Sequence, residues 1–134
     1  MPSSGREDAA ATIETLCRSY VTHLESGNLE ALLANFADDA TATSPIFGTL
    51  PARDFYTYVL REITDRSIEL KTIFVGASDP SRVAIHIAYT RTAKGGRPAT
   101  LEGVDVFELT GDGNRFAAVT IIYDTAPVRS DFDR

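Results

Sequence analysis

A single carboxyl group stands among apolar residues in a segment that alternates like a β-strand. In Thr100–Leu109, Asp105 shares one face with Leu101, Phe107 and Leu109, because residues two apart point to the same side of a strand. Burying a carboxylate is costly unless it is paired, hydrogen-bonded or protonated. Burial also raises the pKa of a carboxyl group, which makes it a neutral hydrogen-bond donor near pH 7. Asp105 is therefore the first candidate for acid–base chemistry.

Each candidate also has a purely structural interpretation. Asp105 pairs with a nearby arginine such as Arg91 in the alternative interpretation. Tyr20 lies on the apolar stripe of an expected helix, as a core tyrosine does whose hydroxyl reaches a wet edge. His86 stands between two alanines on an expected strand, where it is either a base or pocket ligand, or a structural or interface histidine.

The sequence contains no nucleophile elbow, phosphate-binding loop, dinucleotide fingerprint or metal-ligand spacing. Asp38 and Asp39 are adjacent, so their side chains diverge, and we interpret the pair as a turn that ends a helix. The simplest expectation is a site without a metal or a cofactor.

Composition narrows the class of protein. The chain has 134 residues, a net charge of -6 and a pI near 4.8, which argues against nucleic acid or an anionic membrane as a partner. Cys17 is the single cysteine, so a disulfide within the chain is excluded. No signal-peptide pattern or membrane-length apolar run is found, and we expect a cytoplasmic protein.

The positioning elements follow from hydrophobic periodicity. Helical spacing predicts three helices, one ended by Gly27 with Asn28 capping the next, and one that begins near Pro51. An alternating pattern predicts strands over Thr41–Phe47, Ser67–Val75, Arg82–Thr92, Thr100–Leu109 and Arg115–Tyr123. We expect one α+β domain over residues 1–134, ordered about 6–127, in which a curved antiparallel sheet wraps around the helices as a cone. The open end of such a cone is a natural pocket for a small molecule.

Three stretches carry a family resemblance: Ser19-Tyr20-Val21, Gly27–Leu32 and Phe36–Thr41. Over about residues 8–126 the chain resembles the nuclear transport factor 2-like superfamily, which includes ketosteroid isomerases and SnoaL-like polyketide cyclases. The resemblance implies a cystatin-like α+β barrel with a mixed, cone-shaped sheet. It does not select one activity, because this fold serves enzymes and binding proteins alike.

The ketosteroid isomerase comparison implies an oxyanion hole. Tyr20 and a protonated Asp105 stand where that family places the two donors to the enolate oxygen. The family's catalytic base is an aspartate before a proline, and Ser44 stands at that position. Because serine does not abstract a carbon-bound proton unaided, the steroid isomerase reaction is put in doubt.

The SnoaL-like comparison implies a different base. Those cyclases carry an aspartate at the end of the last strand, where Asp124 stands, although this residue could equally cap a turn. We therefore predict a cofactor-independent isomerase or cyclase for a small, largely apolar carbonyl compound, with Tyr20, Asp105 and Asp124 as catalytic residues. The predicted substrate contacts are Ser44, Tyr58, His86, Phe107 and Tyr123; Tyr56 and Tyr89 either line the pocket or pack in the core.

Other functions stay open. Ser44 in place of the base is also compatible with a non-catalytic protein that binds a small hydrophobic ligand. Epoxide hydrolases of this fold use an Asp-Arg-Asp arrangement, which Asp105, Arg91 and Asp124 would imitate. Proteins of this family dimerise through the outer face of the sheet, where Val104 and Val106 lie, and we expect a homodimer or, alternatively, a partner-binding module.

Overall fold

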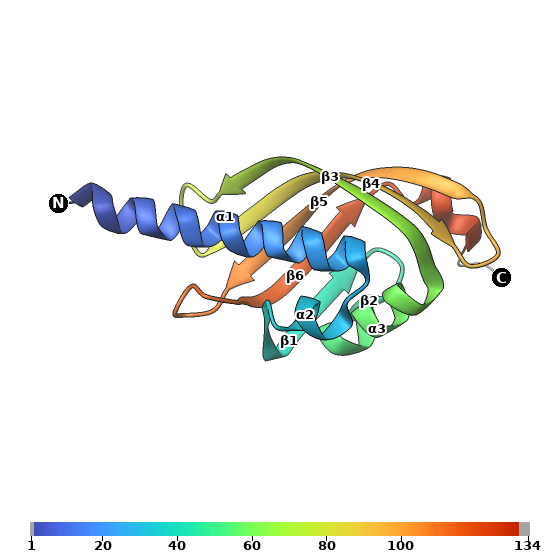
Figure 1. Ribbon diagram of the computed structural model, residues 1–134, viewed down its shortest axis with the longest axis horizontal. Helices are drawn as coiled ribbons and strands as arrows, with labels where there is room; N and C mark the ends of the chain where they lie inside the picture. Colours follow the sequence, from blue (N-terminus) through green and yellow to red (C-terminus); the bar gives the residue numbers. More distant parts are fainter. Residues whose placement is uncertain (1, 132–134) are drawn as a thin grey trace.

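Six strands form one sheet that curves around the first helix (Figure 1). The computed structural model describes residues 2–131, and the side chains of residues 8–129. The helices are α1 (Pro2–Ser26), α2 (Leu29–Leu33), α3 (Ala52–Glu62) and the 3-10 helix η1 (Ala126–Asp131). The strands are β1 (Phe36–Ser44), β2 (Gly48–Pro51), β3 (Ile63–Val75), β4 (Arg82–Ala93), β5 (Pro98–Leu109) and β6 (Phe116–Tyr123).

The sheet is mixed and open. Its order is β2-β1-β6-β5-β4-β3, with β1 and β6 parallel and the other neighbours antiparallel. Strands β2 and β3 form its two edges, so it does not close on itself. This architecture confirms the predicted α+β fold with a curved, mixed sheet and three main helices.

The connection from α1 to α2 follows the expected chemistry. Gly27 has a φ of +77°, a left-handed conformation that glycine adopts without steric cost and that commonly follows a helix. The Asn28 side chain accepts a hydrogen bond of 3.1 Å from the backbone N–H of Ala31, which satisfies a free donor in the first turn of α2. The chain therefore turns sharply here, and α2 packs beside α1 (Figure 1).

The prediction for residues 36–47 was wrong in two ways. Helix α2 ends at Leu33, and Asp38 and Asp39 lie within β1 rather than in a turn that ends a helix. The short edge strand β2 was not predicted. The spacing from Leu33 to Phe36 fits a helix, but Phe36 is buried as part of β1, whose pairing with β6 shifts register between Phe36 and Thr41. This irregularity interrupts the period of two that identifies a strand.

Strands β4 and β5 show the predicted alternation. Val83 and Ile85 on β4 are buried on the concave face against α1. Asp105 pairs with Ile85 in the antiparallel ladder and is itself buried. The concave face of the sheet therefore carries Asp105 toward the helices, as the alternation required.

The chain also differs from expectation after α3 and after β6. The strand expected at Ser67–Val75 begins earlier, at Ile63, directly after α3. After β6 the chain forms η1, where Val128 is completely buried. None of the described helices combines the length and the apolar character needed to cross a membrane.

Candidate functional site

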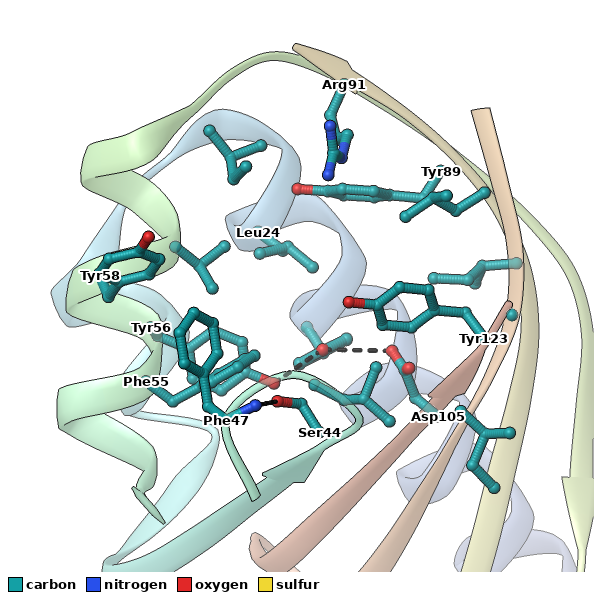
Figure 2. A pocket seen from close by; sticks show the side chains of 18 residues that line it. Leu24, Ser44, Phe47, Phe55, Tyr56, Tyr58, Tyr89, Arg91, Asp105 and Tyr123 are labelled. Carbon is teal, nitrogen blue, oxygen red and sulfur yellow. Dashed lines mark hydrogen bonds between the residues drawn. The ribbon is translucent and has the colours of Figure 1, made fainter. Parts of the chain in front are cut away.

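A pocket lies between the concave face of the sheet, the second half of α1, and α3 (Figure 2). Its empty volume is about 780 Å³, including space open to solvent. Most of the wall is aliphatic or aromatic. The side chains that bring polar atoms to it are Tyr20, Ser44, Tyr56, Tyr58, Tyr89, Arg91, Asp105 and Tyr123.

Asp105 and two tyrosines form a hydrogen-bonded chain at one end of this pocket (Figure 2). The Tyr20 hydroxyl donates to Oδ2 of Asp105 over 3.2 Å. The Tyr20 and Tyr56 hydroxyls are 2.8 Å apart, and either can donate. Asp105 is 4% exposed and both tyrosines are 1% exposed. The three groups come from β5, α1 and α3, so the fold itself assembles this cluster.

Burial is the main influence on the pKa values of the three groups in this cluster. It raises the pKa of Asp105 from 3.8 to about 7, against the lowering effect of the Tyr20 hydrogen bond. It also raises the pKa of Tyr20 well above 10, with the charge of Asp105 adding to the effect. The pKa of Tyr56 rises well above 10 for the same two reasons. Asp105 is therefore able to gain and lose a proton near neutral pH, while both phenols stay protonated donors.

An aromatic layer holds Tyr20 in place. Its ring meets Phe107 edge-on with 4.9 Å between ring centroids, and it also packs edge-on against Phe36 and Phe116. Phe107 and Phe116 stack at 3.9 Å. Phe107 is completely buried and is not among the residues that line the pocket. The expected substrate contact at Phe107 is thus corrected: its ring packs beneath Tyr20 and supports the site indirectly.

Other predicted contacts do reach the pocket. Ser44, Tyr58 and Tyr123 line it, as do Tyr56 and Tyr89, whose position the sequence left open. Ser44 accepts a hydrogen bond of 3.2 Å from the backbone N–H of Phe47. The role of Tyr56 was missed, since its partner Tyr20 is 36 residues away in sequence; the only signal was a tyrosine beside the apolar side of α3.

Two predicted residues lie outside the pocket. Asp124 is exposed, and its Oδ1 accepts a hydrogen bond of 3.0 Å from the backbone N–H of Ala126, so it caps the turn after β6. His86 points to the outer face of β4, whereas its neighbour Ile85 points to the concave face. The Nε2 atom of His86 lies 3.8 Å from Oε1 of Glu102. The structure therefore supports the structural alternative for both residues.

Arg91 lies in the pocket wall but far from Asp105. It is 2% exposed, and it pairs with Ala99, six residues along β5 from Asp105. That separation is about 20 Å along the strand, too far for a guanidinium to pair with the carboxyl group. The Asp105–Arg91 ion pair is therefore wrong, and with Asp124 outside the pocket no Asp-Arg-Asp arrangement forms. Among the described side chains, no cluster of three or more histidine, cysteine or carboxylate groups is placed to hold a metal ion.

Comparison with known proteins places this geometry in a family. The model of the SnoaL-like domain matches residues 17–119, whereas no curated protein sequence matches the chain.

Several solved structures share the fold at low identity. PrhC from Penicillium brasilianum is 16% identical with a TM-score of 0.77, covering 93% of this chain and 88% of that one. A nuclear transport factor 2-like protein of unknown function from Burkholderia pseudomallei is 21% identical with a TM-score of 0.76, covering 92% and 98%. A putative polyketide cyclase from Xanthomonas campestris is 15% identical with a TM-score of 0.73, covering 87% and 93%. These likenesses confirm the fold.

Proposed function

Because the chain belongs to the SnoaL-like domain family, and membership of this family indicates a cyclase-type enzyme in general terms, we propose that it is an isomerase or cyclase. Its substrate is a small, largely apolar carbonyl compound. The observation that carries this proposal is the buried Asp105 carboxyl group, whose oxygen lies 3.2 Å from the Tyr20 hydroxyl in an apolar pocket. A donor and a proton acceptor at this spacing can serve one carbonyl group and the carbon next to it.

The proposed step moves one proton. The substrate carbonyl oxygen accepts a hydrogen bond from Tyr20. The ionised Asp105 removes a proton from the neighbouring carbon, whose electron pair forms the carbon–carbon double bond of an enolate. Asp105 is then a neutral acid that donates to the enolate oxygen, completing a Tyr20/Asp105 oxyanion hole. It finally returns the proton, to another carbon in an isomerisation or to the new alkoxide in an aldol-type cyclisation.

The hydrogen-bonded chain favours this transfer because the negative charge moves only a short distance. In the free protein Tyr20 donates to the carboxylate of Asp105; when the substrate binds, the same hydroxyl turns to the carbonyl oxygen and goes on donating to it as it becomes the enolate oxygen. Tyr56 supports Tyr20 from behind at 2.8 Å. The donors are held before the reaction begins, so little reorganisation opposes it. A β-dicarbonyl substrate fits best, because its proton is acidic enough for a base with a pKa of about 7.

The test is proton exchange. We expect the protein to speed the replacement of the α-protons of ethyl benzoylacetate by deuterium in D₂O, measured by proton NMR against buffer alone. The rate should rise with pH and level off above about 7, because the ionised form of Asp105 is the acceptor. A rate that falls through this range would contradict the proposal.

A second function has its own support. Among the described side chains that line the pocket, Asp105 is the one carboxyl group, and Ser44 stands where the isomerases carry their base. A protein that only binds a small hydrophobic ligand would keep this pocket. Saturable binding of the keto ester without any faster exchange would favour this function over the first.

We further propose a homodimer formed by the outer face of the sheet. Val104 pairs with Ile122 on this face, where Ile122 is 53% exposed, and Phe74 at 49% extends the apolar area. An apolar face of this kind is suited to a second copy of the chain.

A charge on this face should separate the copies. We expect Ile122→Glu to raise the dimer dissociation constant by about a hundredfold, measured by analytical ultracentrifugation. The matched control is Lys94→Glu at the exposed β4–β5 turn, which should leave the dissociation constant unchanged. A monomeric parent protein at high concentration would overturn the proposal.

A further inference from the structure

A second group of polar side chains lies at the end of the pocket opposite to Asp105 (Figure 2). Tyr89 pairs with Leu101, four residues along β5 from Asp105, a distance of about 13 Å along the strand. Arg91 follows two residues later and points to the same face of β4. The pocket therefore has a polar group at each end, and Tyr123, which pairs with Gly103, lies between them (Figure 2).

The Tyr89 hydroxyl is buried, and no hydrogen-bond partner is found for it in the described part of the chain. Leaving a buried hydroxyl without a hydrogen-bond partner is unfavourable. Burial raises the pKa of Tyr89 above its usual value, so the group stays protonated. Tyr89 lines the pocket, so a shift of its side chain on binding brings this donor to a ligand oxygen and supplies the missing partner.

The charges of two arginines act on this hydroxyl. Arg91 is 2% exposed in the pocket wall. The charges of Arg66 and Arg91 both lower the pKa of Tyr89 against the effect of burial, and Arg91 has the same effect on Tyr123. An apolar wall strengthens such a field because it screens charge poorly. Arg91 therefore brings charged N–H donors to this end of the pocket, and hydrogen bonds from such donors are stronger to an anionic oxygen than to a neutral one.

We propose that Tyr89 and Arg91 form a subsite for a carboxylate at the far end of an elongated apolar substrate, whose carbonyl group meets Tyr20 and Asp105. The inference rests on the proposed function for the orientation of the carbonyl group. It adds a substrate class: a carbonyl compound with an acidic tail. The two polar ends fix which end of the molecule enters first, and so which carbon faces Asp105.

Three matched probes test the subsite by isothermal titration calorimetry, with no need for turnover. They are para-phenylphenol, the same molecule with a carboxylate at the para position of the other ring, and the methyl ester of that acid. We expect the carboxylate to bind about tenfold more tightly than para-phenylphenol, because charge-assisted hydrogen bonds are the stronger kind. The ester should gain much less. Equal affinities of the three probes would overturn the subsite.

Variants assign the effect to residues. Tyr89→Phe should reduce the carboxylate preference about threefold or more, leave para-phenylphenol binding unchanged, and keep or raise the Tm, since it removes an unpaired hydroxyl. Arg91→Met should abolish the preference. If Arg91→Met does not fold, Tyr89→Phe decides: a carboxylate preference equal to that of the parent protein would refute the assignment.

The two proposals fail in different ways. Tyr20→Phe should weaken the phenol and its carboxylate by the same factor, because both phenol oxygens meet the same donor. If Tyr20→Phe changes neither affinity while the carboxylate preference persists, the proposed function is contradicted and the subsite stands. If Tyr20→Phe weakens both but no preference exists, the subsite is contradicted and the proposed function stands.

Discussion

Replacing Asp105 by asparagine is expected to slow the exchange of α-protons in ethyl benzoylacetate by a factor of about a hundred to ten thousand. The amide has nearly the shape of the carboxyl group and can still hydrogen-bond to Tyr20, but it cannot accept a proton. Because Asp105 is buried, water does not easily take over its role. The rate is measured by proton NMR in D₂O at pH 8, where the parent carboxyl group is ionised.

Two matched aspartate variants separate the candidate bases. Asp38→Asn changes an exposed residue of β1 and should leave the rate unchanged. Asp124→Asn should also leave it unchanged, because Asp124 is exposed and caps the turn after β6. A large loss in Asp124→Asn with no loss in Asp105→Asn would restore the base that the family resemblance implied and remove Asp105 from the reaction.

The same substitution should also change how stability depends on pH. Since the pKa of Asp105 in the folded protein is raised from 3.8 to about 7, the folded state holds a proton that the unfolded state has already lost between these values. The contribution of Asp105 to stability is therefore fully present below about pH 4 and is lost as the pH rises to about 7. The full loss is about 4 kcal/mol, at about 1.4 kcal/mol per tenfold change in proton affinity.

Urea denaturation at a series of pH values gives this quantity as a difference between two proteins. We expect Asp105→Asn to gain about 4 kcal/mol in free energy of unfolding relative to the parent between pH 4 and pH 8. The comparison cancels the other titrating groups, which both proteins share. Tyr20→Phe is a useful third protein: it removes the hydrogen bond that lowers the pKa of Asp105, so the loss should extend to higher pH. A constant difference across the range would show that Asp105 titrates normally.

The elements that could be predicted from the sequence are those in which the hydrophobic pattern repeats without interruption. Strands β4 and β5 alternate over 12 residues each, and this regularity alone placed Asp105 on the concave face. The prediction failed for residues 36–40, because β1 has an irregular register against β6 there and because Phe36 extends the helical spacing of the preceding helix; Thr41–Ser44 is a strand, as predicted. Pairing between distant strands decided this region, and such pairing leaves little trace in a short window of sequence.

For the site residues, alternation along a strand indicates which face of the sheet a side chain lies on, but not its position along that face. Alternation indicates that His86 and Ile85 point to opposite sides of β4, and with Ile85 in the core His86 had to face outward. It does not indicate how far along the face a residue lies, so Phe107 was assigned to the pocket although its ring packs beneath Tyr20. The approach of Tyr56 to Tyr20 depends on how α3 is placed against α1, which only the assembled fold determines.

Tyr20 packs in the hydrophobic core and also lines the proposed active site. These two roles together limit how the substrate specificity of such proteins can change during evolution. Its ring packs against Phe36, Phe107 and Phe116. A mutation at Tyr20 that adapts the pocket to a new substrate would therefore also disturb the core and destabilise the fold. Positions such as Tyr58 and Tyr123, which are less deeply buried, are freer of that conflict. Substitutions that change the substrate should therefore accumulate at these less buried pocket positions, whereas Tyr20 and the aromatic residues around it should change little during evolution.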